Sequence, residues 1–111
     1  MNLPKGWEND VETFKKECDF SSILRDQCIE HLHLVYNTLL SMEVELPHSI
    51  YNSISGFHLV WNRLTLHIFV TGDEDAPNDI YSIQIFSGHR PPIVKDYSNV
   101  EDAIGEIERL I

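Results

Sequence analysis

The first part of the chain is patterned as two amphipathic helices. Over about residues 9–18, apolar side chains recur at helical spacing, at Val11, Phe14 and Cys18, and charged residues fill the other faces. A longer helix is predicted over about residues 22–42. Its apolar stripe is continuous and consists of Leu24, Cys28, Leu32, Val35, Tyr36 and Leu39. This helix must end before Leu46, because Pro47 disfavours the α conformation in the residue that precedes it.

The pattern then changes to alternation at every second residue, which predicts strands with one buried face. Two such runs, at about residues 57–61 and 64–70, flank Asn62-Arg63. We expect this pair to form a two-residue hairpin turn or a slightly longer loop. A third strand is predicted at about residues 80–86, and the Pro91-Pro92 pair is expected to end the sheet there. The pattern therefore predicts a three-stranded antiparallel meander.

A last helix is predicted near the end of the chain. Ser98 and Glu101 have the spacing of a capping box, S-x-x-E. The apolar stripe that follows consists of Val100, Ala103, Ile104, Ile107 and Leu110, and the acidic residues, Glu106 among them, are expected to face water. The order of elements predicts a single α+β two-layer domain over residues 1–111, with helices on the apolar face of the meander. The opposite face is semi-apolar, so we expect the N-terminal helix or a partner to cover part of it.

Part of the chain resembles a family of small uncharacterised bacterial proteins. Three segments carry the resemblance: Leu46-Pro47-His48-Ser49-Ile50, Gly56-Phe57-His58-Leu59-Val60-Trp61, and the alternating Leu64, Leu66 and Ile68. They are similar to a pattern of helix, L-P-x-[PS]-I loop, G-x-x-L-x-W strand, hairpin and C-terminal helix. The resemblance covers about residues 30–111 and departs at Ser49, where proline is usual. It implies the order of the fold and transfers no catalytic residue.

The charge of the chain narrows the classes of partner. Its 111 residues include 18 acidic and 8 basic side chains, which gives a net charge of −10. Direct binding of nucleic acid is disfavoured, because neutralising phosphates requires a basic surface. An acidic protein is instead steered towards a basic cleft. We therefore expect a small acidic binding protein that neutralises or inhibits a basic protein partner, since immunity proteins, antitoxins and phage inhibitors share this size and charge.

Two alternatives remain open. The first is an accessory or scaffold subunit that forms a homodimer through the sheet. The second is a small metal-dependent enzyme that uses His58 and His67, which a two-residue turn would place opposite each other, with Cβ atoms about 5 Å apart. Two imidazoles can chelate a metal or share acid–base work, but a metal site needs at least one further ligand. We expect two surface histidines on a strand pair, with no metal, no cofactor and no enzymatic activity.

An acidic loop follows the second predicted strand. Its carboxylates, Asp73, Glu74, Asp75 and Asp79, lack the glycine and glutamate positions of an EF-hand, so we expect a solvated loop. With His58, His67 and Phe69, this loop is the predicted contact for a basic partner. Trp61, Phe69 and Tyr97 would supply aromatic anchors if they are exposed.

The cysteines and the first residues of the chain indicate in which compartment of the cell the protein is expected. Cys18 and Cys28 form neither a CxxC pair nor a zinc-binding spacing, so we expect two reduced structural thiols. The first eight residues contain no apolar run behind Lys5, and no stretch approaches the ~20 apolar residues of a membrane span. These features predict a cytoplasmic protein without a membrane contact.

Overall fold

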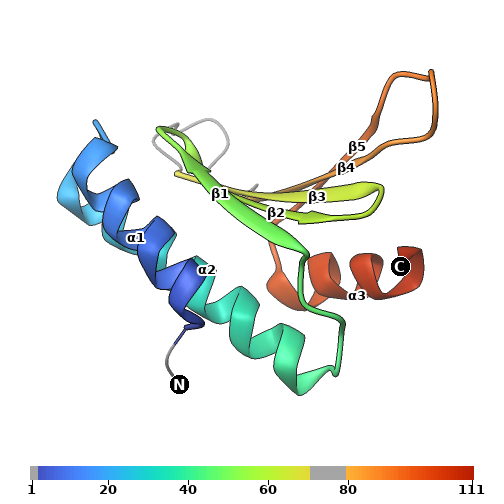
Figure 1. Cartoon of the computed structure of the whole chain (residues 1–111), viewed down its shortest axis with the longest axis horizontal. Coiled ribbons are helices and arrows are strands. Elements are labelled where there is room, and N and C mark those ends of the chain that lie inside the picture. The colour runs from blue at the N-terminus through green and yellow to red at the C-terminus, as the bar shows by residue number, and fades with distance from the viewer. Residues whose placement is uncertain (1–2, 71–79) are drawn as a thin grey trace.

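The computed structural model describes residues 3–70 and 80–111 and contains an antiparallel sheet with three helices on one side (Figure 1). The helices are α1 (Lys5–Glu17), α2 (Ser22–Ser41) and α3 (Val100–Leu110). The strands are β1 (Ser49–Ser53), β2 (Gly56–Trp61), β3 (Leu64–Phe69), β4 (Tyr81–Ile85) and β5 (Ile93–Tyr97), and they lie in the sheet in chain order. The predicted α+β class is confirmed, but three strands is an underestimate.

The prediction missed the two edge strands of the sheet. β1 reads Ser-Ile-Tyr-Asn-Ser, which contains only two strong strand formers, and it pairs antiparallel with β2. β5 begins directly after Pro91-Pro92, so these prolines lie in the connection between β4 and β5 and do not end the sheet. The side chains of β5 are almost all exposed. Edge strands like these owe their order to hydrogen bonds with one neighbour, and alternating burial does not reveal them.

The inner face of the sheet is buried beneath the helices. Phe14 of α1 packs against Phe57 of β2, with ring centroids 4.7 Å apart. α2 contacts β3 and α3, and α3 contacts β4 and β5. Trp7 packs edge-on against Tyr36, at 5.1 Å between centroids, and this contact joins α1 to α2. The buried apolar residues of all these elements form a single cluster.

The outer face of the sheet carries none of the described helices. α1 packs against β1 and, through Phe14, against Phe57 on the inner face. Of the two covers expected for the outer face, the N-terminal helix or a partner, the helix is therefore excluded. The strand register assigns the following side chains to the outer face: Tyr51, Ser53, His58, Val60, Thr65, His67, Phe69, Ser82, Gln84, Val94 and Asp96.

Two predictions about α3 are corrected by its contacts. Its N-cap is Asn99, whose side chain accepts a hydrogen bond from the backbone N–H of Asp102, so the predicted capping box at Ser98 is wrong by one residue. Glu106 does not face water. It is buried, and its carboxylate binds Lys95 of β5 and Arg109 of the next turn.

Within residues 3–70 and 80–111, none of the helices has both the length and the apolar composition that crossing a bilayer requires.

The two cysteines, Cys18 and Cys28, are both free. Burial raises the pKa of the Cys28 thiol to about 12, with the nearby Cys18 adding to the effect. At neutral pH the Cys28 thiol is therefore protonated, as expected for a structural cysteine.

Candidate functional site

Four aromatic rings from three strands form a ladder across the outer face. Tyr51 of β1 stacks on His58 of β2, with ring centroids 4.4 Å apart and planes 6° from parallel. His58 stacks in turn on His67 of β3 at 3.9 Å, and Phe69 packs against His67 at 3.7 Å. We call Tyr51, His58, His67 and Phe69 the ring ladder.

The register of the β2–β3 hairpin brings the two histidines together. His58 lies directly opposite His67, and Trp61 opposite Leu64, which leaves Asn62-Arg63 as a two-residue turn. The predicted pairing is therefore confirmed. Glu43 is the only non-glycine residue with positive φ in the described part of the chain, so the turn does not use the positive φ that asparagine tolerates.

Two serines hold the edges of the histidine rings. The hydroxyl oxygen of Ser53 lies 3.0 Å from Nε2 of His58 and 2.9 Å from the hydroxyl of Ser55. The Ser55 hydroxyl lies 3.4 Å from Nε2 of His67. The hydrophobic pattern indicates neither of these serines nor Tyr51, because it does not predict β1. The adjacent strand formers Ile50 and Tyr51, set between serine and asparagine, were the available signal.

Burial keeps the two imidazoles uncharged. His67 is only 9% exposed, which corrects the expectation of two surface histidines. Desolvation, with a smaller contribution in the same direction from the neighbouring His58, lowers the pKa of His67 to about 4. Desolvation also lowers the pKa of His58. Both rings are therefore neutral at pH 7, with their faces packed against neighbouring rings and their Nε2 edges within reach of serine hydroxyls.

The arrangement adds little support to metal binding or acid–base catalysis. Throughout residues 3–70 and 80–111, no group of three or more His, Cys, Asp or Glu side chains is placed to hold a metal ion. In the same part of the chain, neither ring of the ladder's two histidines hydrogen bonds to a carboxylate. The contacts present are ring stacking and neutral hydrogen bonds, which suit recognition of another surface.

Most of the other residues predicted to contact a basic partner do not lie on the described outer face. Asp73, Glu74, Asp75 and Asp79 lie outside the described residues. Trp61 is buried on the inner face, where its indole N–H donates to the backbone oxygen of Glu45 at 2.8 Å, so it cannot anchor a partner. Tyr97 pairs with Tyr81 and also points to the inner face. Of the three proposed anchors, only Phe69 belongs to the outer face, and it is half-buried.

Comparison of this chain with protein-family models, with curated proteins and with solved structures gives no match in any of the three.

Proposed function

We propose that the protein is a small acidic binding protein that neutralises or inhibits a basic protein partner, and that the partner docks on the outer face of the sheet. The observation that carries this proposal is the ring ladder, which lies on the face that none of the described helices covers. Aromatic side chains supply much of the contact energy in protein interfaces.

The outer face has the mixture of rigid and exposed groups that an interface needs. Tyr51 at one edge strand is 49% exposed, and Val94 at the other is 53% exposed. Between them the histidines are fixed by stacking and by the serine hydroxyls, so little side-chain entropy remains to be lost on binding. The exposed tyrosine combines an apolar ring with a hydroxyl that can donate to a partner.

Charge decides which partner this face favours. A net charge of −10 attracts basic proteins over distances beyond contact and repels acidic ones. Asp96 lies on the outer face of β5 and is exposed, which places a carboxylate beside Val94 where a basic side chain could meet it. Steering of this kind weakens with salt, because the screening length falls from about 10 Å at 0.1 M to about 3 Å at 1 M ionic strength.

The test compares three forms of the immobilised chain: wild type, Tyr51→Ala and Leu34→Ala. Leu34 lies on α2 and is 45% exposed, so its variant removes a similar exposed apolar group from the other side of the molecule. We expect wild type and Leu34→Ala to retain a basic protein from cell extract at about 50 mM salt and release it at about 500 mM. Tyr51→Ala should weaken retention at least about tenfold.

The retained protein is then purified and its own activity measured as the chain is added. Loss of that activity at a stoichiometric ratio would support inhibition. Retention that ignores salt, or that survives Tyr51→Ala unchanged, contradicts docking of a basic partner on the outer face.

The same face would also accommodate a second copy of the chain, because its exposed residues lie on two edge strands. The response to salt separates the two functions. Two copies with a net charge of −10 repel each other, so salt should strengthen a homodimer while it weakens the complex with a basic protein. Light scattering at two protein concentrations and two salt concentrations measures this directly.

A further inference from the structure

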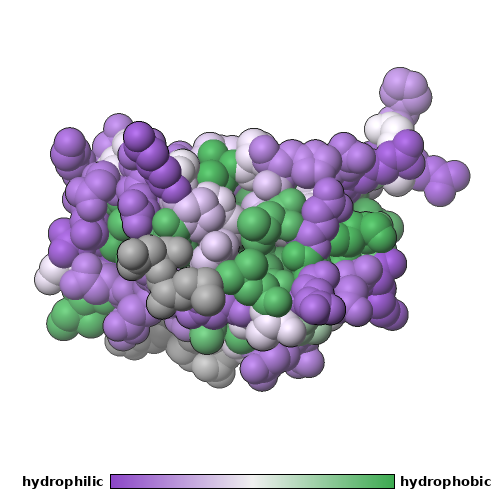
Figure 2. Space-filling view, turned by 60° about the horizontal axis from the view of Figure 1, so that its bottom comes forward, coloured by the Kyte–Doolittle hydropathy of each residue, from purple (hydrophilic) through white to green (hydrophobic). Residues whose placement is uncertain are grey.

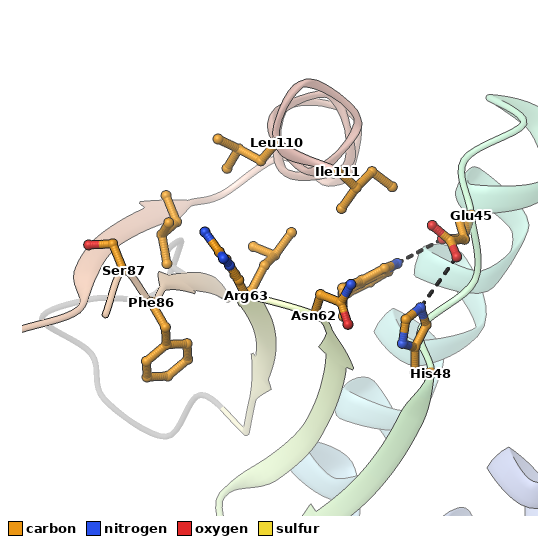
Figure 3. Close-up of a pocket in the computed structure, with 11 residues that line it drawn as sticks. Glu45, His48, Asn62, Arg63, Phe86, Ser87, Leu110 and Ile111 are labelled. Carbon is orange, nitrogen blue, oxygen red and sulfur yellow. Dashed lines mark hydrogen bonds and ion pairs between the residues drawn. The ribbon is translucent and has the colours of Figure 1, made fainter. Parts of the chain in front are cut away.

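A pocket of about 450 Å³ lies at the opposite end of the sheet from Ser53 and Ser55. It is bounded by the β2–β3 turn, the end of β4, the last residues of α3 and the loop that leads into β1 (Figure 3). Pockets that hold small molecules combine apolar walls with a few polar groups that fix the orientation of the ligand. This pocket has apolar walls and a few polar groups, and the residues that form them differ from those assigned above to the outer face.

Arg63 lines the pocket between Phe86 and Ser87 on one side and Asn62 on the other (Figure 3). Its side chain extends from the β2–β3 turn towards Leu110 and the last turn of α3 (Figure 3). Several other basic side chains have a carboxylate within 4.0 Å: Lys15, Arg25, Lys95 and Arg109. Arg63 has no such partner among residues 3–70 and 80–111, although the chain is strongly acidic. A guanidinium in this position can bind a carboxylate through two parallel hydrogen bonds.

Among residues 3–70 and 80–111, the only carboxylate side chain that lines the pocket is that of Glu45, and it is engaged elsewhere. Glu45 lies with His48 at the opposite side of the pocket from Arg63 (Figure 3), and its Oε1 is 3.3 Å from Nε2 of His48. Asn62 lies between Arg63 and this pair (Figure 3), and Trp61 also lines the pocket. Within residues 3–70 and 80–111, no carboxylate therefore lies within 4.0 Å of the Arg63 guanidinium.

The remaining walls are apolar and partly open to solvent. Leu64 and Ile85 line the sheet side, and Leu110 and Ile111, which are 44% and 49% exposed, line the helix side. Hydrophobic surface gathers beneath the projecting β4–β5 hairpin, on the right of the space-filling view (Figure 2). Covering these side chains would remove apolar area from water, and an aliphatic chain is the simplest group that does so.

We propose that this pocket binds an aliphatic monocarboxylate, with Arg63 holding the carboxylate and Leu64, Ile85, Leu110 and Ile111 covering the tail. The ligand needs a single negative charge, because the pocket contributes one cation and the rest of the chain repels further charge. This site is independent of the proposed protein partner, since its residues and those of the outer face do not overlap.

The test is a titration of the chain, residues 1–111, with decanoate, monitored by nuclear magnetic resonance. The chain has two tryptophans, and only Trp61 lines the pocket. We expect decanoate to shift the indole N–H signal of Trp61 in a saturable way and to leave that of Trp7 in place. Decanol has the same tail without the charge and should bind at least about tenfold more weakly, because a hydrogen-bonded charge pair is lost.

Arg63→Gln is the decisive variant and Arg90→Gln its control. Both residues are exposed, so neither change should impair folding, and thermal melting checks this. Arg90 lies in the β4–β5 connection and does not line the pocket. We expect Arg63→Gln to weaken decanoate binding at least about tenfold and Arg90→Gln to leave it unchanged. Equal affinity of decanoate for wild type and Arg63→Gln, or of decanol and decanoate for wild type, would overturn the proposal.

Discussion

His67 should make the fold sensitive to mild acid. In the folded chain burial lowers its pKa to about 4, whereas an unfolded chain leaves it near the ordinary value of 6.5. Between these two values the unfolded state binds the proton more strongly than the folded state does. Stability is therefore complete above about pH 6.5 and is lost progressively as the pH falls towards 4.

The magnitude follows from that difference in pKa. The difference corresponds to at most about 3 kcal/mol of unfolding free energy at pH 4. His67 retains some contact with solvent, which screens the charge of the protonated ring, so the realised loss is smaller. We expect His67 to account for about 1–2 kcal/mol of the stability lost between pH 7 and pH 5.

His67→Phe tests this expectation, because phenylalanine keeps a ring between His58 and Phe69 but cannot be protonated. Urea unfolding is followed by tryptophan fluorescence at pH 7, 6 and 5 for wild type, His67→Phe and His89→Gln. His89 is exposed in the β4–β5 connection, so its variant controls for removal of an unconstrained histidine. The stability of His67→Phe should fall less than that of wild type. Parallel curves for wild type and His67→Phe would refute the reasoning.

Three further predictions concern individual elements. Asn99→Ala should cost about 1 kcal/mol in chemical unfolding by removing the N-cap of α3, whereas Ser98→Ala should change stability by less than about 0.5 kcal/mol; equal effects would contradict the assigned cap. Gly56→Ala should prevent folding at 37 °C as judged by circular dichroism, because φ of Gly56 is +140° and an added Cβ would lie 1.9 Å from the Ile68 carbonyl oxygen. Gly105→Ala should instead raise the melting temperature, because a Cβ added there has no heavy atom within 4 Å and alanine favours the helix. Hydrogen bonds from Lys95 and, to a smaller extent, from Arg109 lower the pKa of Glu106, so the stability that these bonds provide is present above about pH 4.5 and is lost as the pH falls through the lower folded value. Glu106→Gln should therefore reduce the dependence of the unfolding free energy on pH in that window. An unchanged dependence would contradict the ion pairs assigned to Glu106.

The histidine pair shows how far the candidate site follows from the sequence. Alternation on both sides of Asn62-Arg63 assigns His58 and His67 to the same face, and a two-residue turn, which the structure contains, places them opposite each other. The sequence does not indicate that His67 is buried. His58 and Phe69 pack against the ring of His67, and Ser55 of the β1–β2 turn contacts its edge. That turn depends on β1, a strand that the hydrophobic pattern does not predict.

The pocket at Arg63, unlike the histidine pair, could not be predicted from the sequence. Its walls come from residues 45–48, 61–64, 85–87 and 110–111, which no local pattern connects. Their proximity depends on α3 returning beneath the sheet, and that return is a property of the packed core. The same packing buries Glu106, because the inner face of β5 brings Lys95 to α3.

The sequence by itself determined the elements whose apolar residues repeat with a clear period, namely the helices and the three central strands, because burial of one face is encoded locally in that period. It also determined the net charge. Only the tertiary structure decided the edge strands, the burial of His67 and Glu106, and the walls of the Arg63 pocket. Each of these arises from side chains or strands that meet across long stretches of chain, and such meetings are selected by the packing of the whole core rather than by any single segment.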